Sequence, residues 1–109
     1  MVTSVVEGCI GTTVRCIEAC EKCAAECGTS GDKAREACAV VAHDCADIGS
    51  LSLALMSRGS KYVKDICAVH AKVCDACAEM CAKFPTCACC KACMEACRAC
   101  AVECRACCK

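Results

Sequence analysis

Thiol side chains are concentrated in the segment CACCKACMEACRACAVECRACC, near the end of the 109-residue chain. This segment contains neither glycine nor proline. Gaps of three and four positions alternate between the cysteines of its regular part, which are Cys90, Cys93, Cys97, Cys100, Cys104 and Cys107. At about 100° per residue, a helix places such side chains on one arc of roughly 100°, as in residues that pack between helices. Thiolates are nucleophiles and soft metal ligands, so this face is a candidate redox or metal-binding surface.

The rest of the chain repeats this pattern. Gaps of seven, four or three positions separate the cysteines of three further segments: Cys9, Cys16, Cys20, Cys23 and Cys27; Cys38 and Cys45; Cys67, Cys74, Cys77 and Cys81. Each set falls on one face of its own helix. The other cysteines, Cys87, Cys89 and Cys108, border the last set. We therefore expect a core that consists mostly of thiols, and all 20 cysteines are candidate metal ligands.

Core packing and disulfide formation account for the cysteines less well than metal binding does. Cysteine can serve as a small core hydrophobe, but leucine, valine or alanine would pack as well without the risk of oxidation. Disulfides within one helix are disfavoured, because side chains three or four positions apart have nearly parallel Cα–Cβ bonds. Disulfides between helices stay open as an alternative, whereas reduced thiols in a cytosolic protein favour metal binding.

Copper(I) is the predicted metal. It selects thiolates and needs only two or three of them, so bridging sulfurs would hold up to about one copper per cysteine, roughly 20 per chain. Each Cu⁺ then cancels one thiolate charge. Zinc, with four thiolates per ion, would give about five sites that each bury about two negative charges, which is costly. The sequence thus predicts high-capacity Cu(I) storage, and the alternative is a zinc or cadmium buffer of the metallothionein type.

Composition argues against several other functions. Lysine plus arginine and aspartate plus glutamate both total 13, and the chain has no tryptophan, so neither charge nor stacking surfaces favour nucleic-acid binding. No segment approaches the roughly 20 apolar residues of a membrane-spanning helix, and no export signal is recognisable, so we expect a cytoplasmic protein without a membrane partner. Long regular helices do not wrap an iron–sulfur cluster, and redox enzymes use one or two reactive thiols, so we expect no enzyme.

Three turn signals divide the chain into four helical segments. They are GTSG, after which Asp32 can cap a helix; SRGS; and FPT, in which Pro85 stops one helix and Thr86 can cap the next. The predicted helices cover residues 3–27, 32–56, 61–83 and 86–108. Short connections between helices of similar length predict an all-α, antiparallel up-down four-helix bundle, forming one domain over residues 1–109 with a cysteine-lined core.

The sulfur-lined segments resemble the bacterial copper storage proteins. The similarity covers nearly the whole chain and is most specific in CIEACEKCAAEC, HDCADI, ICAVHAKVCDACAEMC and CKACMEACRACAVECRAC. This resemblance implies a Cys-lined four-helix bundle that holds many Cu(I) ions in each protomer and assembles as a homotetramer. The lack of an export signal points to the cytosolic branch of that family.

The chain departs from the family pattern at three places. Cys87 and Cys89 stand where histidines often precede the last helix. Gly49 and His70 occupy positions where other members can have cysteine. The last two cysteines, Cys107 and Cys108, fall where the family often ends with methionine.

Antiparallel packing predicts two different ends of the bundle. One end gathers residues expected to form an apolar plug, although Cys107 and Cys108 lie there too: Val5, Val6, Ile48, Leu51, Leu55, Met56, Val63 and Ile66. The other end gathers cysteines beside the GTSG and FPT turns: Cys23, Cys27, Cys38, Cys77, Cys81, Cys87, Cys89 and Cys90. We expect copper to enter at this second end.

A few other side chains could take part. His70 lies on the thiol face and is either a metal ligand or a hydrogen-bonded core histidine, whereas His43 projects away from its thiol face and is expected in solvent. Met80 and Met94 are soft potential ligands, but residues beside the seam more often fill gaps. Apolar residues off the thiol faces predict a second buried surface and hence oligomers: Val14, Ile17, Val40, Val69 and Val73.

Overall fold

Four α-helices make up the computed structural model, which describes residues 4–109. The helices are α1 (Ser4–Gly28), α2 (Lys33–Ser57), α3 (Val63–Cys81) and α4 (Ala88–Cys107). The predicted all-α bundle is confirmed, and the expected start of the first helix at residue 3 lies outside the described residues. Ala, Glu, Lys and Arg fill the positions between the cysteines, and these residues favour helix.

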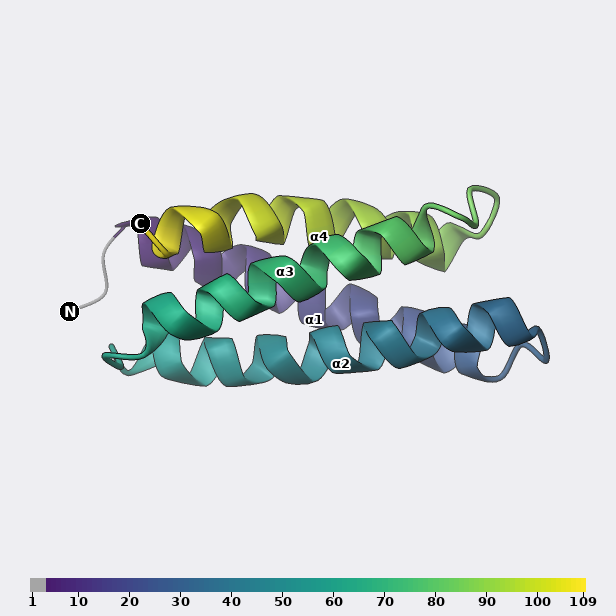
Figure 1. The fold of residues 1–109 in the computed structure, drawn as a ribbon, viewed down its shortest axis with the longest axis horizontal. Coiled ribbons are helices and arrows are strands. Elements are labelled where there is room, and N and C mark those ends of the chain that lie inside the picture. The colour runs from purple at the N-terminus through teal and green to yellow at the C-terminus, as the bar shows by residue number, and fades with distance from the viewer. Residues whose placement is uncertain (1–3) are drawn as a thin grey trace.

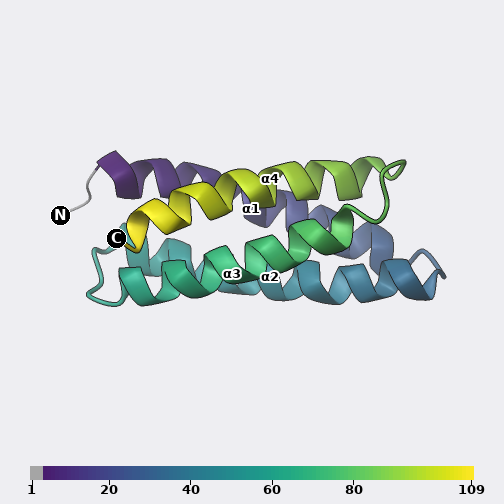
Figure 2. The ribbon, with the colours of Figure 1, turned by 45° about the horizontal axis from the view of Figure 1, so that its top comes forward.

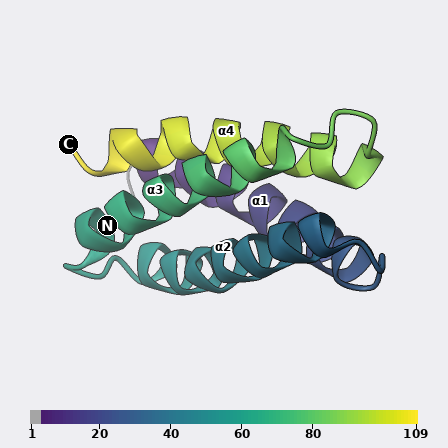
Figure 3. The ribbon, with the colours of Figure 1, turned by 45° about the vertical axis from the view of Figure 1, so that its right-hand side comes forward.

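The helices run antiparallel around one interior. Figure 1 shows the start of α1, the end of α4 and the α2–α3 turn at one end, and the α1–α2 and α3–α4 turns at the opposite end. We call these the terminal end and the two-turn end. Each helix packs on two neighbours, α1 on α2 and α4, and α3 on α2 and α4, as the turned views in Figures 2 and 3 also show. The result is a rod of 45 × 18 × 17 Å whose four inward faces meet along its axis.

The two turns at the two-turn end differ in how they start the next helix. Asp32 caps α2 as predicted, because its side chain accepts a hydrogen bond from the Ala34 N–H at 2.9 Å. The predicted cap at Thr86 is wrong, since Cys87 is the N-cap of α4 and makes no side-chain cap bond. Pro85 disfavours helical backbone at Phe84. A Cys87 N–H to Phe84 O bond of 3.1 Å then closes a turn that moves the start of α4 past Thr86.

One helix differs from the expectation about membranes. By length and composition α2 could cross a membrane, since an 18-residue window of it has a mean hydropathy of 1.4. The expectation that no segment approaches this limit is therefore wrong for α2. The physical reason is that α2 is apolar on two faces. Cys38, Cys45 and Met56 fill the core, while Val40 and Leu51 lie on the outer face.

Candidate metal centre

The core of the bundle is made of sulfur, alanine and a few larger groups. All cysteines carry free thiols, and all but Cys87 and Cys108 are buried. The only buried polar or charged side chains of residues 4–109 are Thr12, Thr13, Ser52 and His70. No disulfide links the helices in the described part of the chain, so the geometry here is that of reduced thiols.

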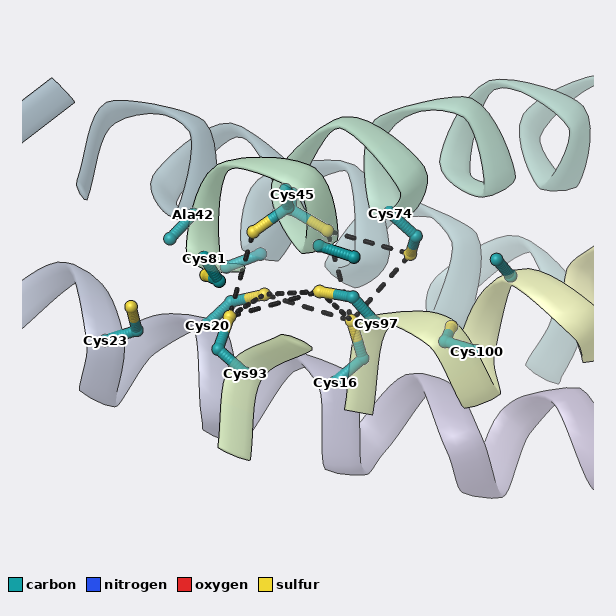
Figure 4. Close-up of a cluster of buried hydrophobic side chains, with 14 of the residues drawn as sticks. Cys16, Cys20, Cys23, Ala42, Cys45, Cys74, Cys81, Cys93, Cys97 and Cys100 are labelled. Carbon is teal, nitrogen blue, oxygen red and sulfur yellow. Dashed lines mark hydrogen bonds between the residues drawn. The ribbon is translucent and has the colours of Figure 1, made fainter. Parts of the chain in front are cut away.

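A central cluster of thiols receives side chains from all four helices. Its members are Cys16, Cys20, Cys45, Cys74, Cys77, Cys93 and Cys97. The sulfur of Cys16 lies 3.8–3.9 Å from the sulfurs of four neighbours: Cys20, Cys45, Cys74 and Cys97. Figure 4 shows these side chains converging on the bundle axis. Each sulfur therefore faces several others, as bridging ligands must.

A second group, the mouth cluster, lies at the two-turn end. It consists of Cys23, Cys27, Cys87, Cys89 and Cys90. The sulfurs of Cys27 and Cys90 are 3.5 Å apart, and those of Cys87 and Cys89 are 3.4 Å apart. Cys87 is half-exposed, whereas Cys90 is fully buried, so the mouth cluster leads from the surface into the core.

A pair of thiols lies beside the mouth cluster. The sulfurs of Cys38 on α2 and Cys81 on α3 are 3.5 Å apart. Together with Cys23 and Cys90, this pair brings four sulfurs within 4.8 Å of one another. The cysteines expected at the two-turn end therefore meet across all four helices, except that Cys77 joins the central cluster.

A third group of thiols, the terminal cluster, lies toward the other end of the bundle, beside the Thr13 hydroxyl and the His70 imidazole. Cys104 Sγ lies 3.5 Å from Cys9 Sγ and 3.8 Å from Cys100 Sγ. Thr13 Oγ1 lies 3.5 Å from Cys100 Sγ. We define the terminal cluster as Cys9, Cys67, Cys100, Cys104, Cys107 and Cys108. Sequence spacing did not single out Thr13, although it fills the gap of seven between Cys9 and Cys16 on the inward face of α1.

His70 connects the terminal and central clusters. Its Nδ1 lies 3.5 Å from Cys104 Sγ and 3.8 Å from Cys100 Sγ, while its Nε2 lies 3.9 Å from Cys45 Sγ. The imidazole is fully buried. Both ring nitrogens thus face sulfur, which places His70 among the candidate ligands rather than beside them. His43, by contrast, is exposed, as expected.

Burial and contacts between thiols shift the pKa values of the core cysteines. Burial raises the pKa of Cys89 and of Cys107 to about 12. Hydrogen bonding with Cys16 likewise raises the pKa of Cys97 in the central cluster. Most of the core is therefore protonated at neutral pH, so metal uptake has to release protons.

Hydrogen bonding lowers the pKa of other thiols, among them Cys87 and Cys100. At the mouth, the Cys90 backbone N–H and the nearby Arg35 guanidinium lower the pKa of Cys87 to about 7. Inside, hydrogen bonds from Cys104 and His70 lower the pKa of Cys100 to about 5. Burial opposes the charged form of His70, but its sulfur partners outweigh burial and raise its pKa to about 12. An imidazolium–thiolate pair is therefore favoured between the two clusters.

The predicted apolar plug at the terminal end is incomplete. Met56 is fully buried, but Val5 and Leu51 are 44% and 50% exposed, and the other plug residues are half-buried. A hollow of about 430 Å³ opens between the first turns of α1 and α3 and the last turn of α4. Small residues, Ser60, Ala106 and Cys107, are part of its lining. The predicted apolar plug is therefore only partly buried, and a hollow lies beside it.

The methionines and the apolar residues off the thiol faces have distinct places in the bundle. Met80 and Met94 are half-buried against the core, as gap-filling residues would be. Val40 and Val69 are 63% and 46% exposed, as a second apolar surface requires. Ile17 differs, because its side chain closes over Gly49 in the α1–α2 interface. It therefore serves packing within the bundle.

Four cysteines of α4 and its N-cap have the spacing C-x-x-C-x-x-C-x-x-x-C, which is also that of a ferredoxin motif. They are Cys87, Cys90, Cys93 and Cys97. Their contacts do not fit a shared iron–sulfur cluster. Cys90 faces Cys27, Cys93 faces Cys77, and Cys97 faces Cys16, each on another helix. The spacing is a consequence of the helical repeat.

Comparison with known proteins identifies relatives along nearly the whole chain. Residues 2–109 match the model of the copper storage protein (Csp) family. The cysteine-rich protein YhjQ of Bacillus subtilis (strain 168), described as uncharacterized, is 36% identical over 78 residues, which are 71% of this chain and 72% of that protein.

Solved structures with the same fold include two forms of one family member. The Cu(I)-bound copper storage protein BsCsp3 has a TM-score of 0.88 and 34% identity, covering 94% of this chain and 97% of its own. Apo-Csp3 from Bacillus subtilis has a TM-score of 0.83 and 34% identity over 94% and 98% of the two chains. A protein of Nitrosospira multiformis has a TM-score of 0.86 and 29% identity over 95% and 94%. The sulfur-lined bundle and these matches together show that the chain belongs to the copper storage protein family.

Proposed function

We propose that this protein stores Cu(I), many ions per chain, on the thiolates inside the bundle. The observation that carries the proposal is the sharing of sulfurs between neighbouring candidate sites. Cys20 and Cys97 belong both to a group with Cys16 and Cys45 and to a group with Cys77 and Cys93. Separate tetrahedral zinc sites need four thiolates each and do not share them in this way, whereas Cu(I) accepts two or three bridging thiolates.

The candidate ligands are the 20 cysteines and His70. A filled core stays close to neutral, because each Cu⁺ replaces one thiol proton. Bridging by every thiol would set the upper limit near one copper per cysteine, roughly 20 ions. The family match and the Cu(I)-bound BsCsp3 structure support this metal.

Anaerobic titration of the reduced protein with Cu(I), in the presence of excess Zn(II), tests the proposal. We expect a load well above one copper per two cysteines, with one proton released per ion and no displacement by zinc. Cys97→Ser plus Cys100→Ser should lower the load, and Ala99→Ser, on the exposed face of the same helix, serves as the matched control. Saturation near five ions with copper displaced by zinc would instead support a metallothionein-type buffer.

One group of ligands favours the zinc alternative locally. Cys16, His70, Cys74 and Cys100 offer three sulfurs and one imidazole nitrogen within 4.8 Å of one another, which is a ligand set of structural zinc sites. Co(II) added to the apo protein would report such a site by its thiolate charge-transfer absorption. His70→Ala should change that absorption, because this group then loses its nitrogen ligand, while a load of many Cu(I) ions remains.

Copper uptake at the mouth cluster is part of this proposal. Cys87 is half-exposed, has a pKa of about 7, and touches Cys89, which in turn lies 4.0 Å from Cys27. A thiolate at the surface can accept Cu⁺ and pass it inward by exchange from sulfur to sulfur. No bare ion is released on this route.

We further propose that the protein acts in the cytoplasm as a homotetramer, without catalysis and without nucleic-acid or membrane partners. The exposed residues Val40, Val69 and Val102 support an oligomer, because they offer apolar surface that a monomer leaves in water. Light scattering coupled to size-exclusion chromatography tests the tetramer. Val40→Lys should shift the mass toward smaller species, while Ala37→Lys on the exposed side of the same helix serves as the control.

A further inference from the structure

The thiols of the core continue to the surface at the terminal end as well. The sulfurs of Cys9 and Cys104 are 3.5 Å apart, and Cys107 ends the same helix, α4, three residues after Cys104. Cys107 Sγ lies 3.7 Å from the Val5 carbonyl oxygen at the start of α1. Cys108 is half-exposed. The terminal cluster thus extends from the half-exposed Cys108 at the surface to buried thiols in the core, as the mouth cluster does at the other end.

Cys107 lines a basic hollow at this end. Lys61, Lys64, Lys109 and Cys107 line the hollow of about 430 Å³, together with apolar groups such as Val5 and Val63. No aspartate or glutamate among the described residues lines it. Its volume falls within the range of sites for small molecules, about 300–1,000 Å³. Three lysines in the lining of one hollow favour an anion and oppose the approach of a bare metal cation.

We propose that this basic hollow is a second uptake site, which accepts Cu(I) carried by a small anionic thiol. The inference rests on the storage function proposed above. The lysines attract the carboxylates of the carrier, Val5 and Val63 contact its apolar part, and Cys107 receives the copper. The two ends of the bundle then differ in the donor that they serve.

The transfer is a ligand exchange in which copper stays Cu⁺. The sulfur of Cys107 forms a bond to copper, and the bond between copper and the carrier's sulfur breaks. The thiol proton of Cys107 moves to the departing sulfur, so the carrier leaves as a neutral thiol group and charge is balanced. Copper then passes inward to the Cys9–Cys104 pair by the same exchange.

Anaerobic stopped-flow measurement of the rate of copper loading tests the proposal with two donors. Cu(I)–glutathione is anionic, whereas the thiol in Cu(I)–2-mercaptoethanol carries no carboxylate. In the Cys87→Ser plus Cys89→Ser background we expect glutathione to keep delivering copper. Adding Cys107→Ser plus Cys108→Ser should then slow loading by about tenfold or more. Unchanged loading after this addition would overturn the proposal.

The lysines give an independent test in the otherwise unchanged protein. Lys61→Gln plus Lys64→Gln should slow delivery from glutathione several-fold at low ionic strength and leave delivery from mercaptoethanol unchanged. Lys72→Gln, on the exposed surface of α3 away from the hollow, is the matched control. Equal slowing with both donors, or no slowing with either, would contradict an anion-binding role.

The final copper load separates this proposal from the storage function. All of these variants should still fill most of the core, with the loss of about one ion per removed thiol. A low load in every protein would reject storage itself. A high load with unchanged rates would leave storage intact and remove the second uptake site.

Discussion

A Cβ atom at Gly49 would lie 3.1 Å from Nε2 of His70 and 3.0 Å from Cγ1 of Ile17. The absence of a side chain at Gly49 on α2 is thus what makes room for a buried imidazole on α3. The histidine in turn reaches Cys45 on one side and Cys104 on the other. Gly49 and His70 both interrupt the sulfur faces of their helices, and the small residue at one position makes room for the large residue at the other.

Gly49→Ala should reveal this relationship in stability. Overpacking costs about 1–3 kcal/mol, and the better helix propensity of alanine returns about 1 kcal/mol, so we expect a net destabilisation of roughly 1 kcal/mol. In the His70→Ala background the same substitution should be less destabilising, because its clash with the imidazole is gone while the contact with Ile17 Cγ1 remains. Urea unfolding of the apo protein measures both.

Gly11→Ala is the matched control for that experiment. A Cβ at Gly11 would meet only the Arg15 guanidinium, at 3.7 Å, so alanine should stabilise α1 by about 1 kcal/mol in both backgrounds. Equal effects of Gly49→Ala with and without His70 would show that the two residues are not coupled.

The mouth cluster should control the rate of loading from an uncharged donor. Cys87→Ser plus Cys89→Ser removes the only half-exposed thiol of the mouth cluster and its contact. We expect slower uptake from Cu(I)–2-mercaptoethanol with most of the capacity kept. Cys97→Ser plus Cys100→Ser, deep in the core, should lower capacity and change the rate little. If the mouth variant loads at the wild-type rate and loses only capacity, Cys87 and Cys89 are merely additional storage ligands.

Cys87 should also be the most reactive thiol of the apo protein. Its pKa of about 7 lies below the ordinary value of 9.0, so its thiolate fraction rises as pH increases through 7 and falls below it. Alkylation by iodoacetamide, followed by peptide mass mapping, should show this midpoint at Cys87. Arg35→Gln should raise the midpoint, because the guanidinium lies 3.5 Å from Cys87 Sγ. Lys33→Gln, an exposed charge change on the same helix, should not.

The empty protein should already be helical. Thiols, alanines and Met56 are buried without any metal, and Asp32 caps α2, so folding does not depend on coordination. Circular dichroism of the reduced, chelated protein should show mostly helix, and Cu(I) should change the spectrum little. A coil spectrum that becomes helical only with metal would contradict a preformed core.

The sequence determined which face of each helix carries sulfur. Spacings of three, four and seven fix the angle of a side chain about its own helix axis, so the inward positions of Cys16, Cys45, Cys74 and Cys97 followed from the sequence. The turn signals and the Asp32 cap divided the chain correctly into four helices, because cap and turn chemistry is local. The copper storage fold could therefore be recognised without coordinates.

Only the tertiary structure decided which sulfurs meet and where they reach the surface. Contact between Cys16 and Cys97, or between His70 and Cys104, depends on how far each helix is shifted along the bundle axis. That shift results from side-chain volumes at the interfaces, such as the missing Cβ of Gly49. The hollow at Cys107 likewise depends on how three helix ends fill space, which periodicity does not encode.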